Sequence, residues 1–345
     1  MAGAGMAGLA AAARARELGA DVVVHEKGDR PGGSMLLSSG MIWRYREWER
    51  FREECPRGEP GLQRPVWERL DDDLAWLERV GAPVVERRTG NPLTTGVRFD
   101  PSGLTEALGR RAGRIRLLQP LTELPQGLPV ILATGGFQGS RRLVRSHITP
   151  EARNLVLRAN PWSTGDGLSL GLGRGAEVSP GMDEFYGRNL AAVPEISSDD
   201  FVPLAQVYGK YARVENLRGE PYEVRTWSEI DVVQWTARQP GACARYLVPD
   251  EALGAPVREQ TVANVIEAAR RAGAPVERRN GSTVVEVVAG ITTTLGGLRV
   301  DERARAADGL YVAGADAGGI STGGWSSGLA AALVFGKIAA ESALS

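Results

Sequence analysis

The chain begins with a glycine-rich turn, Gly3-Ala4-Gly5-Met6-Ala7-Gly8, which has the spacing G-x-G-x-x-G. Good helix formers follow to about Leu18, and the segment from Asp21 to Glu26 is then typical of a buried parallel strand. In such a turn the first glycine allows the bend, the second lets the backbone approach a pyrophosphate, and the third lets helix and sheet pack closely. N–H groups at the helix N-terminus attract the phosphates. The turn therefore predicts an α/β unit that binds a dinucleotide.

Glu26 follows Gly8 by 18 positions and ends the next strand, where a carboxylate can accept hydrogen bonds from both ribose hydroxyls. An ordinary helix start followed by a solvated glutamate is the alternative interpretation. Only Met1 and Ala2 precede Gly3, whereas this turn normally follows a strand of about 5–6 residues at the centre of the sheet. We therefore expect the sequence given to lack most of that strand and to be less stable for it.

The composition argues against several other classes of protein. Lys and Arg number 41 and Asp and Glu 42, a net charge of −1, so we expect no nucleic-acid partner. No apolar run reaches the roughly 18–20 residues of a membrane span. With only two cysteines, Cys55 and Cys243, and two histidines, we expect no metal site. A reduced cytoplasmic protein fits best, with one disulfide as the alternative.

Local patterns divide the rest of the chain. From Gly181 to Gly290 the composition changes and indicates an inserted domain, so we expect three segments: 1–180, 181–290 and 291–345. The expected elements are helices within 43–88, strands at Arg114–Leu118, Leu128–Ala133 and Gly309–Ala313, a helix after Gly165, an amphipathic helix near Val262–Ala272 and a final helix over Gly328–Ala343.

Several stretches resemble one group of flavoproteins. Glu26–Ser34 resembles E-K-x-x-x-x-G-G-x-S, Val130–Phe137 matches V-I-L-A-T-G-G-F, and Gly309–Asp316 is similar to G-L-Y-A-A-G-[ED]. Ser163–Gly167 and Thr294–Leu298 match the same group, and all five lie in its order along nearly the whole chain. The chain thus resembles the FAD-dependent fumarate reductase/succinate dehydrogenase flavoprotein superfamily, which includes 3-ketosteroid dehydrogenases and tricarballylate dehydrogenase. The resemblance implies an α/β fold: a doubly wound, Rossmann-like FAD-binding domain with an inserted α+β cap domain.

The resemblance also implies roles for individual residues. Glu26 would hold the adenosine ribose and Asp316 the ribityl chain, while the last helix, beginning near Gly328, would point its N-terminus at the flavin N1/C2=O edge. A helix N-terminus there favours the negative charge of reduced flavin. A flexible loop is the alternative for residues 323–328. The expected FAD-binding residues are Gly3, Gly5, Met6, Ala7, Gly8, Glu26, Lys27, Gly32, Gly33, Ser34, Ser39, Gly40, Ala133, Thr134, Gly135, Asp166, Gly314, Asp316, Gly328 and Leu329.

The sequence departs from the family's pattern in three places. Residues 35–42 contain no histidine, so we expect non-covalent FAD. The position of the family's proton-donating arginine falls at or near Glu229, with Arg225 shifted along the chain. Ser321, Thr322 and Trp325 stand where the family has a substrate-clamping histidine and arginine. We therefore expect the dicarboxylate site to be lost and fumarate reduction to be disfavoured.

The reaction implied is hydride transfer between flavin N5 and a small organic substrate with an activated carbon–carbon bond. An electron donor or acceptor, not identified by the sequence, completes the cycle. A catalytically decayed or truncated flavin-binding paralogue without turnover is the alternative. The candidate catalytic residues, for each of which simple packing is the alternative role, are Tyr208, Tyr211, Arg225, Glu229, Thr294, Ser321 and Trp325.

Overall fold

The computed structural model describes residues 1–223, 226 and 228–345, and they form two compact units. The first unit comprises residues 1–140, 159–184 and 293–345, and the second comprises 141–158 and 185–292. The second unit therefore takes in most of the expected insertion and, in addition, a short segment before it. That these residues cap a substrate stays a prediction.

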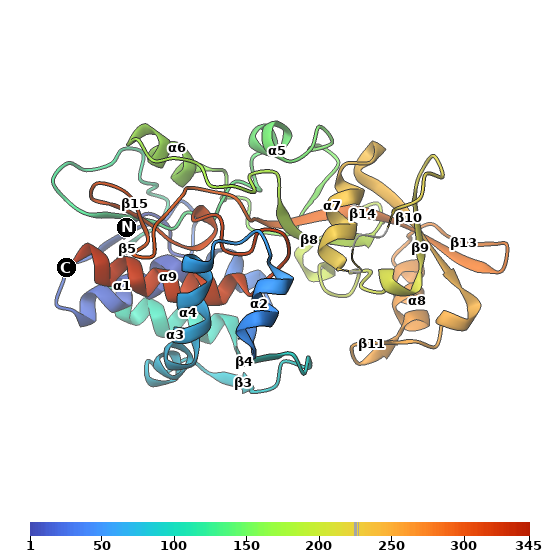
Figure 1. Cartoon of the computed structure of the whole chain (residues 1–345), viewed down its shortest axis with the longest axis horizontal. Helices are drawn as coiled ribbons and strands as arrows, with labels where there is room; N and C mark the ends of the chain where they lie inside the picture. The colour runs from blue at the N-terminus through green and yellow to red at the C-terminus, as the bar shows by residue number, and fades with distance from the viewer. Residues whose placement is uncertain (224–225, 227) are drawn as a thin grey trace. The chain divides into compact units, whose positions relative to one another are not determined.

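The first unit is built on a mainly parallel sheet with the strand order β5–β1–β6–β16–β15, in which Ala2 separates β1 from β6. Figure 1 labels the two edge strands of this sheet, β5 and β15. Ala2 forms parallel bridges to both His25 and Leu132, and its N–H donates to the Ile131 carbonyl at 2.9 Å. Met1 and Ala2 therefore occupy the central position expected for the strand before the glycine-rich turn. The strands are β1 (Val23–His25), β5 (Arg114–Arg116), β6 (Val130–Leu132), β15 (Arg305–Ala307) and β16 (Leu310–Val312).

Three helices pack together beside this sheet: α1 (Met6–Glu17), α4 (Pro101–Ala112) and α9 (Gly328–Ala343). Helix α1 is rich in alanine and buried along most of its length, because small side chains allow close approach to α9 and α4. Ser327 caps α9 by accepting a hydrogen bond from the Ala330 N–H at 3.3 Å. The final helix has the bounds expected from the sequence, and the parallel sheet with its helices confirms the α/β class.

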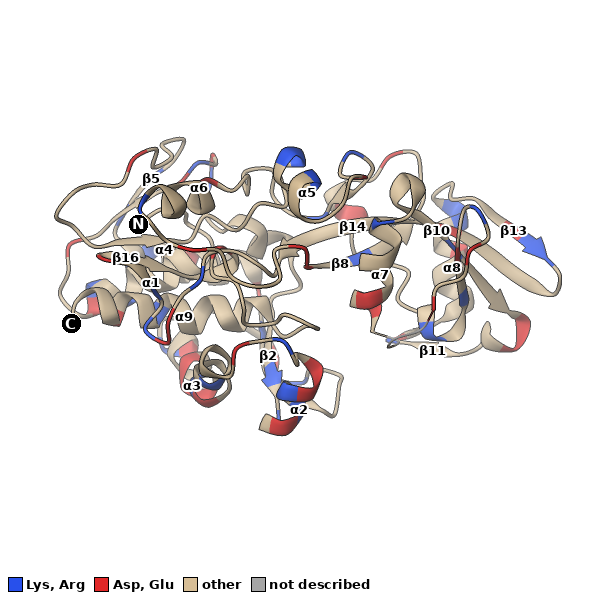
Figure 2. Cartoon of the chain, turned by 45° about the horizontal axis from the view of Figure 1, so that its top comes forward, with Lys and Arg blue, Asp and Glu red and all other residues tan. Residues whose placement is uncertain are grey.

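The helices expected within residues 43–88 form in the middle of this range, and the helical interpretation was wrong at its two ends. These ends belong to a small antiparallel sheet with the order β2–β4–β3, whose strands gain their hydrogen bonds from distant residues that local periodicity does not reveal. Only α3 and the shorter α2 are helical, and α3 carries exposed charges of both signs around a buried leucine face (Figure 2). The elements are β2 (Met41–Tyr45), α2 (Trp48–Glu54), α3 (Pro60–Arg79), β3 (Val84–Glu86) and β4 (Thr94–Phe99), followed later by α6 (Asp166–Gly173).

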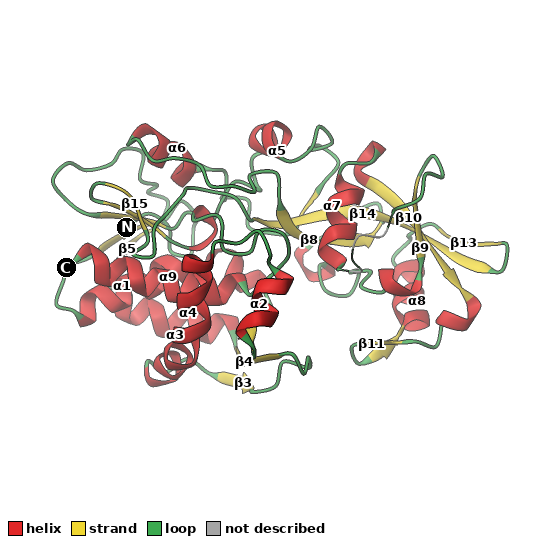
Figure 3. Cartoon of the chain, viewed as in Figure 1, coloured by secondary structure: helices red, strands yellow, loops and turns green. Residues whose placement is uncertain are grey.

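The described part of the second unit forms a mixed sheet with the order β13–β14–β10–β9, in which β7 and β8 also pair with β14 (Figure 3). Helix α7 packs on β8 and β10, and the amphipathic helix α8 packs on β13. The core between them is aromatic and β-branched, with Tyr208, Val232, Tyr246 and Val285 fully buried or nearly so. The elements are α5 (Arg141–His147), β7 (Val156–Leu157), β8 (Phe185–Ala191), β9 (Arg213–Asn216), α7 (Glu229–Ala237), β10 (Cys243–Pro249), β11 (Pro256–Val257), β12 (Gln260–Thr261), α8 (Val262–Arg271), β13 (Val276–Arg279) and β14 (Ser282–Thr294).

Candidate functional site

The glycine-rich turn has the shape that a pyrophosphate requires. Gly3 has φ +97°, and a Cβ at this position would lie 2.1 Å from the Ala133 carbonyl oxygen. A Cβ on Gly8 would lie 1.9 Å from the Gly3 oxygen, so α1 begins in direct contact with the turn. A Cβ on Gly5 would meet nothing closer than 4.0 Å, and no side chain caps α1. The backbone at Gly5 is therefore open to phosphate oxygens at a positive helix end.

Glu26 lies beside this turn and is only 7% exposed. One carboxylate oxygen accepts a hydrogen bond from the Ala4 N–H at 2.7 Å, and the other accepts one from the Gly28 N–H at 2.6 Å. A carboxylate offers about four acceptor positions, so each oxygen keeps one for a ribose hydroxyl. Asp29, three residues further on, is exposed and paired with Arg30 at 3.1 Å. The backbone thus orients Glu26, and not Asp29, toward the turn.

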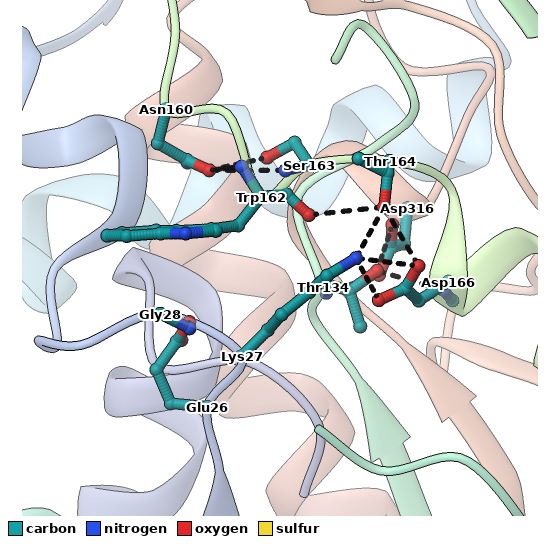
Figure 4. Close-up of polar contacts among 11 residues, drawn as sticks. Glu26, Lys27, Gly28, Thr134, Asn160, Trp162, Ser163, Thr164, Asp166 and Asp316 are labelled. Atoms are coloured by element: carbon teal, nitrogen blue, oxygen red, sulfur yellow. Dashed lines mark hydrogen bonds and ion pairs between the residues drawn. The ribbon is translucent and has the colours of Figure 1, made fainter. Parts of the chain in front are cut away.

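A tryptophan that carried no sequence signal covers the segment after Glu26. A Cβ built on Gly28 would lie 2.5 Å from the Trp162 ring, and the Arg30 guanidinium lies 5.3 Å from the centroid of the same ring. Beside it, Lys27 Nζ donates to Thr164 Oγ1 at 2.6 Å and to Asp166 Oδ2 at 2.9 Å (Figure 4). Two of the expected FAD-binding residues, Lys27 and Asp166, therefore form an ion pair although 139 positions separate them.

Asp316 is 2% exposed and holds the loop after β6. Its carboxylate accepts hydrogen bonds from Thr134 N–H, from Thr134 Oγ1 at 3.1 Å and from Gly136 N–H at 2.8 Å (Figure 4). Burial raises the pKa of Asp316, and the hydrogen bonds from Gly136 and Thr134 oppose that rise. Thr134 Oγ1 also accepts from the Gly167 N–H at 2.9 Å. The structure thus brings together Thr134, Asp316 and the start of α6.

The remaining expected FAD-binding positions surround the same turn. Gly32 bridges Gly5, and Ser34 Oγ accepts from Asn160 Nδ2 at 2.8 Å, so Asn160 is a second neighbour without a sequence signal. Met6, Ala7, Gly8, Gly32, Gly40 and Ala133 are buried, Gly33, Thr134, Gly135, Gly314, Gly328 and Leu329 are half-buried, and Ser39 is exposed.

The loop before α9 is firmly anchored within the first unit. Ser321 and Ser326 share a hydrogen bond of 2.6 Å and are both buried, and the Trp325 carbonyl accepts from the Tyr45 hydroxyl at 2.9 Å. Buried Gln63 donates to the Ile320 carbonyl at 2.9 Å. Elsewhere in the first unit Thr294 is buried, and its Oγ1 has no hydrogen-bond partner among the described residues. The expected residues Ser321, Trp325 and Thr294 thus belong to ordered, mostly buried backbone.

The other catalytic candidates belong to the second unit. Tyr208 is fully buried, its hydroxyl donates to Gln206 Oε1 at 2.7 Å, and burial raises its pKa. Tyr211 is half-buried, with the Lys210 Nζ 4.7 Å from its ring centroid. Glu229 is the first residue of α7, and its Oε1 accepts from the Gly209 N–H at 3.2 Å. Burial raises the pKa of Glu229 to about 7. Arg225 lies outside the described residues.

A comparison with protein families matches residues 1–113 and 128–328 to the family described as "FAD binding domain". The chain belongs to this family. The open glycine turn and the spare acceptor positions of Glu26 fit FAD, which is its cofactor. A comparison with curated proteins finds no significant match.

Solved structures share the fold at low identity. A flavocytochrome c3 fumarate reductase in its open conformation has a TM-score of 0.73 at 18% identity, with 99% of this chain and 77% of that chain covered. A 3-ketosteroid-Δ4-(5α)-dehydrogenase from Rhodococcus jostii RHA1 has a TM-score of 0.71 at 18% identity, covering 99% and 95%. A 3-ketosteroid Δ1-dehydrogenase from Sterolibacterium denitrificans has a TM-score of 0.71 at 15% identity, covering 99% and 98%. The fold is thus that of flavin oxidoreductases.

Among the described residues, two kinds of feature are absent: a membrane-spanning helix and a cluster of metal-ligating side chains. None of their helices is both long and apolar enough to cross a membrane. No group of three or more His, Cys, Asp or Glu side chains among them is placed to hold a metal ion.

Proposed function

We propose that the chain is an FAD-dependent oxidoreductase that acts on an activated carbon–carbon bond of a small organic substrate. The proposal rests mainly on the glycine turn and on Glu26. The backbone of the turn is open to a pyrophosphate, and beside it the carboxylate of Glu26 is held in place and has unused acceptor positions. FAD, when bound, supplies hydride transfer at its N5 atom. Residues 1–180 and 291–345 would hold FAD, and residues 181–290 would cover the substrate and exclude water.

The residues that would hold FAD have distinct tasks. The turn from Gly3 to Gly8 would bind the pyrophosphate, and Glu26 would bind the adenosine ribose. The N-terminus of α9, capped by Ser327, would offer a partial positive charge to the flavin. Residues 35–42 contain no histidine that could form a covalent bond to the flavin. The absence of such a histidine supports non-covalent FAD.

Glu229 is the best of the candidate proton donors. With a pKa of about 7 it is half protonated at neutral pH, so it can give or take a proton with little cost. Tyr208 is a weaker candidate because it is fully enclosed in the core and its hydroxyl is already bound to Gln206. We therefore assign the proton to Glu229 and a packing role to Tyr208.

The substrate is proposed not to be fumarate. Residues 318–327 contain no histidine, lysine or arginine that could hold a second carboxylate, and buried Ser321 is bonded to Ser326. The solved structures named above include a fumarate reductase and two 3-ketosteroid dehydrogenases, so the candidate substrates are enones, enoates and ketosteroids.

Anaerobic reoxidation of the flavin tests the proposal. The FAD-loaded protein is reduced with one equivalent of dithionite and mixed with a panel of enones, enoates, ketosteroids and fumarate, while the flavin absorbance is followed. We expect at least one of the first three classes to reoxidise the flavin within seconds to minutes, and fumarate to have a negligible effect. Persistence of the reduced spectrum with every compound would favour a flavin-binding paralogue without turnover. Rapid reoxidation by fumarate would refute the assignment of the 318–327 loop.

A further inference from the structure

Residues 160–166 of the first unit, which we name the strap, lie along the segment 26–34 that contains Glu26 (Figure 4). The two segments run in opposite directions, because the start of the strap meets the end of the other segment. From the start of the strap onward, the contacts are Asn160 Nδ2 to Ser34 Oγ at 2.8 Å, the Trp162 ring on Gly28, Lys27 Nζ to Thr164 Oγ1 at 2.6 Å, and Lys27 Nζ to Asp166 Oδ2 at 2.9 Å. The strap therefore covers the segment to which the adenosine ribose is assigned.

Trp162 stands in the middle of the strap, and its ring lies on the backbone of Gly28. Three carbons of its six-membered ring are 2.5–2.8 Å from the point where a Cβ of Gly28 would be, so only glycine allows this approach. The Gly28 N–H in turn donates to Glu26 Oε1 at 2.6 Å. Figure 4 shows the indole ring edge-on, over Gly28 and the Glu26 carboxylate. A single glycine thus separates the tryptophan ring from the carboxylate that would bind the ribose.

The backbone of the strap fixes the position of the indole. Asn160 Oδ1 accepts a hydrogen bond from the Trp162 N–H at 2.9 Å and another from the Ser163 N–H at 3.1 Å. The Ser163 carbonyl accepts from the Gly139 N–H at 2.8 Å. Asn160 and Ser163 are buried, whereas Trp162 is only half-buried. The strap therefore presents a partly exposed aromatic ring on a fixed, buried base, and such preorganisation lowers the entropy that a ligand must lose on binding.

An adenine attached to the ribose at Glu26 would lie near this ring, because a single glycosidic bond joins the base to the sugar. Adenine is flat and aromatic, and an aromatic side chain can pack on its π face. Another apolar residue lies close by, since Leu118 donates its N–H to the Gly28 carbonyl at 3.0 Å and is 70% exposed. The surroundings of Gly28 thus combine a carboxylate for the sugar with aromatic and apolar surface for the base.

We propose that Trp162 packs against the adenine of FAD and that the strap holds the adenosine half of the cofactor in place. This rests on the proposed function, because the ligand is the cofactor of that reaction. The glycine turn would take the pyrophosphate, Glu26 the ribose and Trp162 the base, so each part of the ADP moiety has a site within the first unit. Trp162 precedes the motif at Ser163–Gly167 and belongs to none of the motifs found in the sequence.

Isothermal titration of the flavin-free full chain with FAD and with ADP-ribose tests the adenine contact. ADP-ribose has the adenosine diphosphate of FAD but no flavin. We expect Trp162→Leu to raise the Kd of both ligands by the same factor, about 5- to 100-fold, because a base–aromatic contact is lost. Trp162→Phe keeps an aromatic ring and should recover most of the affinity. Trp48→Leu is the matched control, since Trp48 is a half-buried tryptophan of α2 in the same unit, and it should leave both Kd values unchanged.

Tryptophan fluorescence separates contact with the adenine from a purely structural role of Trp162. Because ADP-ribose contains no flavin, a change of fluorescence on its binding does not arise from energy transfer to flavin. We expect such a change in wild type and in Trp48→Leu. It should disappear in Trp162→Phe, although that variant still binds ADP-ribose. A tryptophan that only supports the strap would not give this result, and Trp162→Phe decides the question even if Trp162→Leu fails to fold.

The outcomes separate the adenine contact from the reaction. Equal affinities of wild type and folded Trp162→Leu, a loss seen with FAD but not with ADP-ribose, or a fluorescence change that persists in Trp162→Phe would overturn the contact. If Trp162 affects both ligands as expected but no compound of the panel reoxidises the reduced flavin, the proposed reaction fails and the contact stands. If the flavin is reoxidised while Trp162→Leu holds FAD as tightly as wild type, the reaction stands and the contact fails.

Discussion

Replacing Glu229 with glutamine removes a titrating carboxyl from the N-terminus of α7 while keeping its size and its acceptor for the Gly209 N–H. Burial raises the pKa of Glu229 from 4.5 to about 7, so the folded protein holds this proton more tightly than the unfolded chain does. Stability contributed by the protonated form is therefore present below pH 4.5 and is lost as the pH rises to about 7. Above pH 7 the folded protein carries the full penalty of the ionised carboxylate.

The size of the effect follows from the shift. Each pKa unit corresponds to about 1.4 kcal/mol, so the shift of Glu229 means that its ionisation lowers the free energy of unfolding by about 3 kcal/mol. Because the side chain is only half-buried, solvent screening reduces this cost to about 2–3 kcal/mol. We expect Glu229→Gln to gain that amount relative to wild type at pH 8.5, and less than about 1 kcal/mol at pH 5. Urea denaturation of the FAD-loaded proteins at the two pH values, followed by tryptophan fluorescence, measures the difference.

Glu259→Gln is the control, because Glu259 is an exposed carboxylate in the β11–β12 turn of the same unit. Its stability should follow that of wild type at both pH values. Parallel stability curves for wild type and Glu229→Gln would refute the claim that burial governs this carboxyl. If Glu229 is also the proton donor, flavin reoxidation by substrate should lose its dependence on a group of pKa near 7 in the glutamine variant, and its rate should fall by about 10²–10⁴-fold.

Three further predictions concern the flavin site. Glu26→Ala should weaken FAD binding by about 1.5–3 kcal/mol and Asp29→Ala much less, because only Glu26 is buried against the turn. Fluorescence titration with FAD measures both affinities, and equal losses would contradict the assignment of Glu26 to the ribose. Acid precipitation should release all flavin into the supernatant, and colour retained by the pellet would show a covalent bond. Gly28→Ala should lower stability by about 1–3 kcal/mol, since its Cβ would meet the Trp162 ring at 2.5 Å. Gly109→Ala, in helix α4 with nothing within 4 Å, should instead be neutral or stabilising by up to about 1 kcal/mol in thermal melts.

The sequence was most informative where local chemistry decides local structure. The glycine turn, the alanine-rich α1 and the last helix, Gly328–Ala343, form as expected because spacing, propensity and capping all act within a few residues. The strands β2 and β3 were missed for the opposite reason. They pair with β4, and Met41 of β2 lies opposite Arg98, 57 positions along the chain. Nothing in the local pattern of a five-residue segment reports such a partner.

The same limit applies to the candidate site. Trp162 covers Gly28, and Asn160 contacts Ser34 across 126 positions, but neither residue belongs to a motif. Motifs identify the residues that act through the backbone, whereas side chains that meet only through tertiary pairing need the structure.

The two buried carboxylates of the proposed flavin site, Glu26 and Asp316, differ in how many hydrogen bonds they already accept. Glu26 accepts one hydrogen bond on each oxygen and keeps acceptor positions for a ligand. Asp316 accepts three, from Thr134 and Gly136, and a Cβ on Gly167 would lie 2.4 Å from its Oδ2. Asp316 therefore keeps one acceptor position, on Oδ2, for a ribityl hydroxyl, whereas Glu26 keeps two. We therefore propose that Glu26 makes the stronger contact with FAD, and that Asp316 both holds the loop after β6 and offers FAD a single acceptor position.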